Sequence, residues 1–227
     1  MESVESGLPR LRPASVQEGL RKETSDMTAK ETVFETIRTR RSTRSYSARE
    51  VSREDLDTVL QAGRFAPSGG NNQTTHLLVI TSPEVKEKIA ALAEKLFAKM
   101  EVMPDTYRSM ASAILASKKG GYNFHRDAPV LILAANKSTY SNNIADCSCV
   151  LENMMIMANA MDLGSCWVNQ IKWLNEEPEM LELLHGIGLR EDERVYGGLT
   201  LGYADTPDGL PVRTPLDRKG NEVTFVE

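Results

Sequence analysis

The chain has 227 residues and a formal net charge of −5, with 41% hydrophobic and 26% charged residues. This balance is typical of a globular protein, and the acidic charge argues against a nucleic-acid-binding surface. No apolar run approaches the roughly 18 residues of a membrane-spanning helix, and three cysteines without metal-ligand spacing favour a reduced, cytoplasmic protein.

Residues 1–26 contain no aromatic residue and only scattered aliphatic residues. We therefore expect a flexible N-terminal extension there and a single domain over residues 27–227. Phe34 and Ile37, three positions apart, predict a short helix at the start of this domain. Ser52 and Asp55 have the spacing of a capping box ahead of an apolar stripe, which predicts a second helix.

The rest of the domain alternates strand and helix signals, which predicts an α+β (α/β sandwich) fold with one sheet covered by helices. Ser82 and Pro83 are suited to the first positions of a helix. The expected elements, in chain order, are a strand over 76–82, a helix over 82–100, a buried strand over 128–136, a buried helix over 145–161, an extended segment over 165–170, a helix over 176–185, a strand over 194–203 and an extended tail to 227.

Positive charge gathers in one short segment of this acidic chain. Residues 38–44 contain four arginines, with Ser42 and Thr43 between the last two. Guanidinium groups bind phosphate in a bidentate manner, and hydroxyl groups add further donors. A solvated, charged helix end is the alternative explanation for this segment alone.

Residues 65–76 have the composition of a loop with exposed backbone amides. Pro67, Ser68, Gly69 and Gly70 favour a turn, and three carboxamide residues follow at positions 71–73. Carboxamides donate and accept hydrogen bonds at once, which suits a flat heterocycle with carbonyl and N–H groups. A polar turn explains the proline and glycines but not three consecutive carboxamides.

A third segment combines an apolar stretch with polar residues. Gly164 permits a turn after the buried helix, and the extended residues Trp167 and Val168 lead directly into Asn169 and Gln170. Backbone N–H groups here could reach an acceptor on a ring, whereas an ordinary core strand would not explain the polar pair. The sequence contains no dinucleotide-binding, Walker A, zincin or hydrolase-elbow motif, and we expect no metal site.

Taken together, these segments resemble the FMN-dependent nitroreductase family. The matching motifs are R-R-S-x-R at 40–44, P-S-x-x-N-x-Q at 67–73, L-G-S-C-W at 163–167 and ERVYGGLTLGY at 193–203, in the family's order across roughly residues 31–216. The resemblance implies a central, mainly antiparallel sheet, a homodimer with FMN sites between the subunits, and a C-terminal extension that wraps the partner subunit. It also implies NADH or NADPH as electron donor.

The resemblance assigns roles to particular residues. The first motif would bind the FMN phosphate and the pyrimidine edge of the flavin, and the 67–73 loop would contact FMN from the partner subunit. Backbone amides of the third segment would lie near the flavin N5 and O4 atoms. The implied FMN-binding residues are Arg40, Arg41, Ser42, Arg44, Pro67, Ser68, Gly69, Asn71, Gln73, Trp167, Val168, Asn169, Gln170 and Arg213.

The variable region 97–127 is expected to cover the site, and it offers Tyr107, Tyr122, Phe124 and His125 as candidates to line a substrate pocket. Simple packing of this region is an equal alternative for each of them. No catalytic side chain is expected, because the flavin carries the reaction. Thr74 and Thr75 depart from the family, which often has Pro-Trp there, and so do Asn169 and Gln170, where the family often has small residues.

Three functions remain open from the sequence. The first is reduction of nitroaromatics, quinones or related acceptors by a ping-pong hydride mechanism. The second is reductive dehalogenation or ene-type reduction on the same fold, for which Glu101, Tyr107 and Lys118 or Lys119 lie in the appropriate region. The third is a flavin-binding module without turnover.

Overall fold

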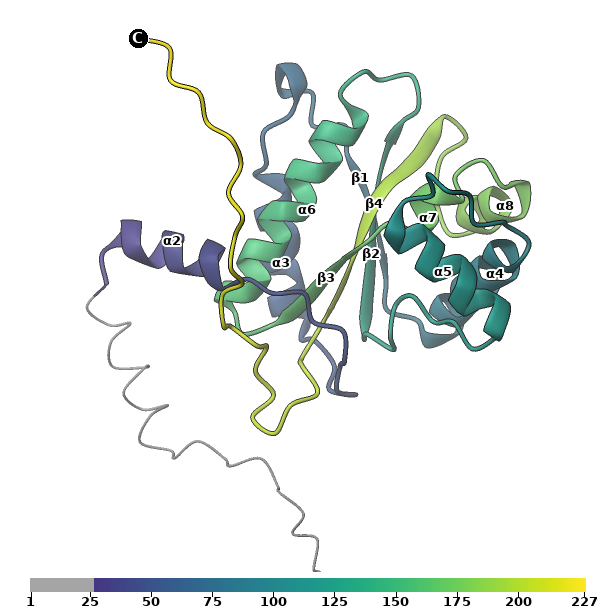
Figure 1. Cartoon of the computed structure of the whole chain (residues 1–227), viewed down its shortest axis with the longest axis horizontal. Helices are drawn as coiled ribbons and strands as arrows, with labels where there is room; N and C mark the ends of the chain where they lie inside the picture. The colour runs from purple at the N-terminus through teal and green to yellow at the C-terminus, as the bar shows by residue number, and fades with distance from the viewer. Residues whose placement is uncertain (1–26) are drawn as a thin grey trace, which may run out of the picture. The chain divides into compact units, whose positions relative to one another are not determined.

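A four-stranded antiparallel sheet forms the centre of the computed structural model, which describes residues 27–227 (Figure 1). The expected N-terminal extension, residues 1–26, lies outside the described residues. The strands are β1 (His76–Ile80), β2 (Val130–Lys137), β3 (Gly164–Val168) and β4 (Glu193–Gly202), in the spatial order β1-β2-β4-β3. Each neighbouring pair is antiparallel, with a bulge in β2 between Ala134 and Ala135.

Helices cover both faces of this sheet (Figure 1). One face packs against α3 (Arg53–Arg64) and α6 (Asn143–Ala160). The helices associated with the other face are α4 (Pro83–Ala98), α5 (Arg108–Lys119), α7 (Gln170–Trp173) and α8 (Pro178–Gly186). The predicted α+β fold, with a central and mainly antiparallel sheet flanked by helices, is therefore confirmed.

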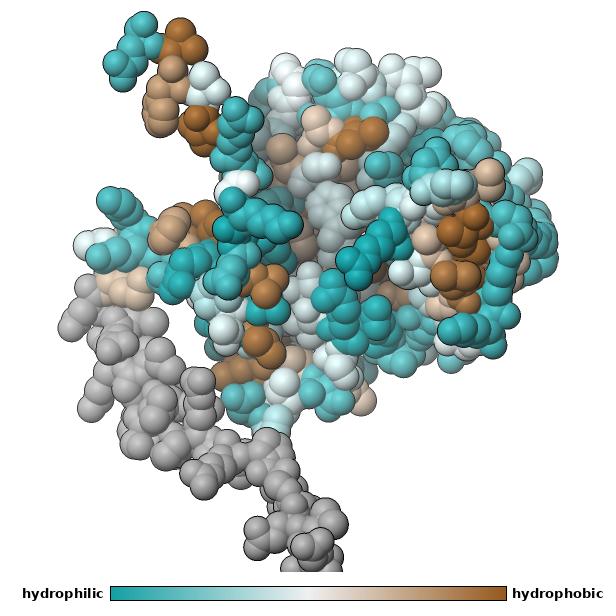
Figure 2. Space-filling view, in the orientation of Figure 1, coloured by the Kyte–Doolittle hydropathy of each residue, from teal (hydrophilic) through white to brown (hydrophobic). Residues whose placement is uncertain are grey.

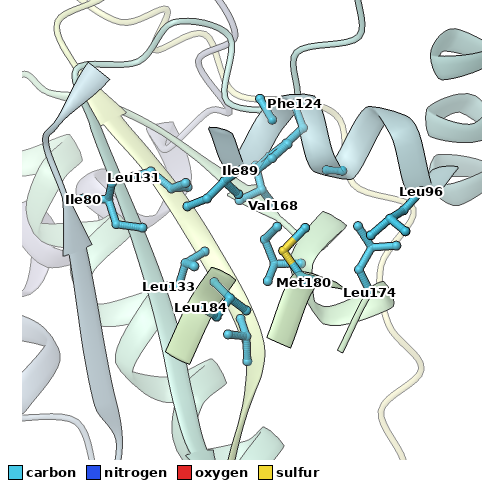
Figure 3. Packing of buried hydrophobic residues seen from close by; sticks show 14 of the residues in the cluster. Ile80, Ile89, Leu96, Phe124, Leu131, Leu133, Val168, Leu174, Met180 and Leu184 are labelled. Carbon is cyan, nitrogen blue, oxygen red and sulfur yellow. The ribbon is translucent and has the colours of Figure 1, made fainter. Parts of the chain in front are cut away.

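The alternation of side chains along β2 explains why the sheet is buried on both faces. Leu131 and Leu133 point into the cluster shared with α4 and α8, whereas Val130 and Ile132 point into the cluster shared with α3 and α6. Successive strand residues face opposite sides, so an apolar run is needed where both sides are covered. Figure 3 shows the first cluster, in which Ile89 and Met180 pack toward the strands.

Both predicted helix caps form. The Ser52 hydroxyl accepts a hydrogen bond from the backbone N–H of Asp55 at 3.0 Å, and the Ser82 hydroxyl accepts one from Val85 at 3.4 Å. Pro83 occupies the first turn of α4. Such caps satisfy N–H groups that have no partner within the helix, which fixes where each helix begins.

The chain divides into two units, one ending at Arg38 and the other running from Thr39 to Glu227. Helix α2 (Ala29–Thr39) lies almost wholly in the first unit, and its start is a capping box in which Thr28 and Glu31 exchange hydrogen bonds. Its apolar residues Val33, Phe34 and Ile37 are exposed. The boundaries of the expected domain stay a prediction.

The residues after β4 contain no further helix or strand within the described chain. From Val212 onward the tail carries exposed hydrophobic side chains, and Phe225 is 83% exposed. Figure 2 shows hydrophobic residues on the projecting end of this tail. Across residues 27–227, no helix has the length and apolar character that a bilayer crossing requires.

Candidate functional site

The arginine segment, residues 40–44, lies beside β3 and continues the sheet. Ser42 forms a parallel bridge with Ser165, and the backbone N–H of Thr43 donates to the Ser165 carbonyl at 2.9 Å. A Cβ atom on Gly164 would lie 2.6 Å from the Thr43 hydroxyl oxygen, so only glycine permits this approach. The first and third sequence motifs are therefore brought into direct contact.

Tyr46 fixes the end of the arginine segment. Its hydroxyl lies 2.8 Å from the Thr200 hydroxyl and donates to the Thr43 carbonyl at 2.8 Å. Burial raises the pKa of Tyr46 well above its usual value, although the contact with Thr200 opposes this shift. The side chain therefore stays protonated and serves as a neutral tether between the segment and β4.

The charges of the arginine segment are only partly used within the chain. Arg41 donates to the carbonyl of Thr214 at 2.5 Å, and Arg213 pairs with Asp162 at 2.7 Å and also donates to the Asn159 carbonyl. Within residues 27–227, neither Arg40 nor Arg44 makes a side-chain hydrogen bond or an ion pair. Two guanidinium groups thus remain available to an anion.

A further cation, Arg126, was not identified from the sequence. Its charge acts on the buried ring of Tyr46, as does that of Arg44, and it also acts on Tyr122. Arg126 and Asp127 both have positive φ values, 54° and 56°, which non-glycine residues adopt only at a cost. Arg126 has no sequence motif around it, and its position follows from the fold of the loop before β2.

The end of β3 connects the arginine segment to the region over α5 and α7. The Trp167 indole N–H donates to the Asn169 side chain at 2.7 Å, and the Gln170 amide donates to the Tyr122 hydroxyl at 2.8 Å. Asn169 and Gln170 do not continue the extended segment as expected, because Asn169 precedes α7 and Gln170 begins it. The side chains of Asn169 and Gln170 therefore contact Trp167 and Tyr122 at the point where β3 ends and α7 begins.

Aromatic side chains line the same region. Tyr107 is 65% exposed and meets the Trp173 ring edge-on at 6.2 Å, while Phe97 meets both Trp173 and Tyr122. Phe124 and His125 are each only 2% exposed. Of the four candidate pocket residues, Tyr107 and Tyr122 thus present surface and the other two are packed inside, and their substrate-binding role stays a prediction.

The 67–73 loop is compact and anchored at its base. Residues Gly69–Asn71 form the 3₁₀ turn η2, and the Ser68 hydroxyl accepts a hydrogen bond from the backbone N–H of Gln73 at 3.0 Å. Gly70, Asn71 and Gln73 all have positive φ values. Pro67, Asn71 and Gln73 are exposed, while Ser68 is half-buried.

The loop does not meet the arginine segment within one chain. It contacts Asp146 near the start of α6, whereas the arginine segment follows Thr39, whose hydroxyl accepts a hydrogen bond from Asn159 near the end of α6. At 1.5 Å per helical residue, Asp146 and Asn159 lie about 20 Å apart along α6. Figure 1 shows the loop and the arginine segment at opposite ends of this helix.

Two groups of expected binding residues therefore emerge. The structure brings the arginine segment, residues 165–170 and Arg213 to one region, together with Arg126. It places the 67–73 loop elsewhere. The first group combines cations, hydroxyl groups and backbone at the end of a strand, which suits a phosphate-bearing ligand with a flat polar ring. No group of metal-ligating side chains occurs among residues 27–227.

Comparisons with known proteins agree with this geometry. Residues 37–203 match the model of the nitroreductase family. A protein from Archaeoglobus fulgidus that carries the name of an NADH dehydrogenase/NAD(P)H nitroreductase is 30% identical over 167 residues, covering 74% of this chain and 82% of the relative. An FMN reductase (NADPH) from Bacillus subtilis is 25% identical, covering 85% of this chain and 74% of the relative.

A solved structure gives the same result. The crystal structure of a nitroreductase with bound FMN from Bacteroides fragilis superimposes with a TM-score of 0.73 at 30% identity. The match covers 86% of this chain and 98% of that one. The structural similarity thus extends over most of this chain and nearly all of the other, and the family match over residues 37–203 includes the three segments described above.

Proposed function

The chain belongs to the nitroreductase family, and we propose that it is an FMN-dependent oxidoreductase that uses NADH or NADPH to reduce nitroaromatic, quinone or related acceptors. The observation that carries this proposal is the arginine segment held against β3 by the Thr43–Ser165 hydrogen bond, with Arg40 and Arg44 free to bind an anion. The FMN-bound relative and the NADPH-dependent relative support the choice of cofactor and donor.

The residues present fit FMN. Arg40, Arg44 and the Ser42 hydroxyl would hold its phosphate, since charge-assisted hydrogen bonds to phosphate are the strongest that side chains make. Arg126, whose charge also acts on Tyr46, adds positive charge that would stabilise the negative charge of reduced flavin. Arg213 would join the phosphate site only by giving up its present contact with Asp162.

FMN, when bound, would supply the hydride-transfer chemistry between NAD(P)H and the acceptor. The chain's part is to bind and orient. Backbone groups at the end of β3, from Trp167 to Gln170, would direct the ring, and Tyr107 and Tyr122 would face the two substrates that enter in turn. No side-chain acid or base is required by this scheme.

The separation along α6 supports a homodimer in which each FMN site uses both subunits. A phosphate or one ring edge cannot be bound at once by groups about 20 Å apart along one helix. A two-fold dimer resolves this, because the loop of one subunit can reach the arginine segment of the other. Each subunit then contributes to two sites.

The tail and the edge of the sheet support the same assembly. Within residues 27–227, no strand pairs with the outer side of β1, and a cleft of about 500 Å³ beside it is lined by Leu77, Val79 and Arg64 among others. An open strand edge favours pairing with another extended chain. The tail is extended, and Val223 and Phe225 are exposed. We therefore infer that the tail wraps the partner subunit.

The dehalogenase alternative rests on one contact. Lys118 on α5 forms an ion pair with Glu101 at 2.7 Å, in the region that would cover the site. A carboxylate and an ammonium group in contact could exchange partners with a zwitterionic amino acid. Halide release from a halotyrosine by the chemically reduced enzyme would favour this alternative, and no release would dismiss it.

The first test is the visible absorbance spectrum of the purified protein under anaerobic conditions, before and after NADH or NADPH. A two-banded flavin spectrum that bleaches would support the proposed reductase and identify the donor. A flavin that stays oxidised would favour a binding module, and no flavin after incubation with FMN would refute the proposal. A cytoplasmic location also stays a prediction from the three free thiols.

A further inference from the structure

Asp146 is a buried carboxylate that the proposed flavin site does not use. It lies in the first turn of α6 and is 4% exposed. Within residues 27–227 no arginine, lysine or histidine pairs with it. Burying a charge without a counter-ion is costly, so the hydrogen-bond donors that contact this carboxylate are needed to offset the cost of burying it.

Those groups belong to the 67–73 loop and to the turn after β2. One carboxylate oxygen of Asp146 accepts a hydrogen bond from the backbone N–H of Gly69 at 3.1 Å. The Tyr140 hydroxyl lies 3.1 Å from the other oxygen and also 3.1 Å from the Gly69 carbonyl. It has one proton, so it donates to one of these acceptors at a time. The start of α6 adds a favourable dipole.

Gly69 is enclosed by the same turn. A Cβ atom at this position would lie 2.1 Å from the Asn142 side chain and 2.6 Å from the Tyr140 hydroxyl. Both the N–H and the carbonyl of Gly69 thus face α6 and the residues before it. We call Asp146, Tyr140 and Gly69 together the loop anchor.

The loop beyond the anchor needs external support. Gly70, Asn71 and Gln73 have φ values of 58°, 55° and 51°, and such conformations cost non-glycine residues of order 1 kcal/mol or more. Within the loop, the Ser68 hydroxyl accepts from the Gln73 N–H and the Gln73 amide donates to Asn71. The N–H groups of Asn71 and Asn72 donate to the carbonyls of Ser68 and Gly69. None of these four bonds joins the loop to the rest of the domain. A segment of this kind keeps one conformation only where its surroundings determine it.

We propose that Asp146 and Tyr140 are positioning residues that hold the 67–73 loop in the conformation that binds FMN. They act through Gly69 and touch neither the cofactor nor the substrates. This inference rests on the proposed function, since the loop is assigned to FMN of the partner subunit. It also gives the start of α6 a role distinct from that of its far end, where the arginine segment lies.

The test compares Asp146→Ala, Tyr140→Phe and the double variant in the full-length protein. FMN affinity is measured by titrating each apoprotein with FMN and following the quenching of flavin fluorescence. Each single variant should raise the FMN dissociation constant about tenfold, the effect of losing one hydrogen bond to a charged group. The double variant should raise it by less than the product, because the two residues share one contact.

Tyr203→Phe is the matched control. The Tyr203 hydroxyl donates to a carboxylate oxygen of Asp55 at 3.3 Å, so this variant removes the same type of bond away from the loop. The control should leave FMN affinity unchanged. Excess FMN should restore turnover in Tyr140→Phe to the wild-type rate, which loss of folded structure would not allow.

Hydrogen exchange of the apoprotein provides a measurement without FMN. Amides of residues 69–73 should exchange faster in Tyr140→Phe than in the wild type and the control. Unchanged exchange and unchanged FMN affinity in both anchor variants would overturn the positioning role. If wild-type protein fails to bind FMN, the proposed function is wrong, and the exchange rates alone still decide whether the anchor orders the loop.

Discussion

Mixed dimers provide the most direct test of how the flavin site is built. One subunit would carry Arg40→Ala and Arg44→Ala, which remove the free guanidinium groups. The other would carry Asn71→Gly and Gln73→Gly, which remove two loop carboxamides. Glycine suits both loop positions, since their φ values of 55° and 51° are in the left-handed region.

The expected losses follow from the contacts removed. Charged hydrogen bonds are worth about 1.5–3 kcal/mol each, so the arginine variant should bind FMN with an affinity lower by a factor of roughly 10² to 10⁴. Neutral hydrogen bonds are worth about 0.5–1.5 kcal/mol each, which gives the loop variant a loss of roughly fivefold to 150-fold. Homodimers of either variant have both sites impaired.

The mixed dimer behaves differently if each site takes its arginines from one subunit and its loop from the other. One of its sites then combines both defects, and the second combines an intact arginine segment with an intact loop. Co-expression with two affinity tags isolates this species. Titration with FMN should reveal one site of wild-type affinity for each mixed dimer.

A single-chain site predicts another result. Every site in the mixed dimer would then carry one defect, and no site of wild-type affinity would appear. That result, obtained with mixed dimers confirmed by mass, would refute the argument from the length of α6. A mixture of the two homodimers that never exchange subunits serves as the negative control.

Three further predictions concern single residues. Gly164→Ala should lower the free energy of unfolding by about 1–3 kcal/mol and weaken FMN binding, because the added Cβ would lie 2.6 Å from the Thr43 hydroxyl. Thermal unfolding and FMN titration measure the two effects, and unchanged values would contradict the prediction. Burial, reinforced by the charge of Lys86, lowers the pKa of His125. The free energy of unfolding should therefore fall as the pH drops below about 6.5, by up to about 1.4 kcal/mol per pH unit. In denaturant titrations His125→Leu should flatten this pH dependence, and an unaltered slope would show that His125 is not its source. Burial raises the pKa of Cys147 to about 12, so iodoacetamide should leave this thiol unmodified at pH 8 in the native protein, and peptide mass spectrometry that finds rapid labelling would contradict its burial.

Local sequence signals predicted much of the fold. Ser52, Ser82 and Pro83 marked the starts of two helices, and the uninterrupted apolar run of β2 indicated a strand covered on both faces. Helix α5 was not predicted, because the segment 97–127 was interpreted as a variable region that covers the site. Only a few apolar side chains of this helix, such as Ala113 and Ile114, are buried, so its apolar stripe is weak. Local chemistry is informative where caps and periodicity agree, and less so where a helix is mostly exposed.

Sequence reasoning predicted some residues of the candidate site and missed others, for a physical reason. The arginine segment and the end of β3 carry recognisable chemistry, and the structure brings them together. Arg126 and the loop anchor depend on contacts between residues distant in sequence, such as Asp146 with Gly69. No pattern in a single sequence shows that a buried carboxylate will meet a particular backbone amide.

The separation of the 67–73 loop and the arginine segment at the two ends of α6 has a consequence for how mutations in the gene would be inherited. If each site is shared between two subunits as proposed, a normal and an altered copy of the gene that are expressed together would form mixed dimers. A lesion in the arginine segment alone, or in the 67–73 loop alone, would leave one working site in each of them. A protein with both lesions would instead place one fault in each of the two sites of a mixed dimer. Such an allele would be dominant over the normal one, whereas each single lesion would reduce activity only in proportion to its dosage.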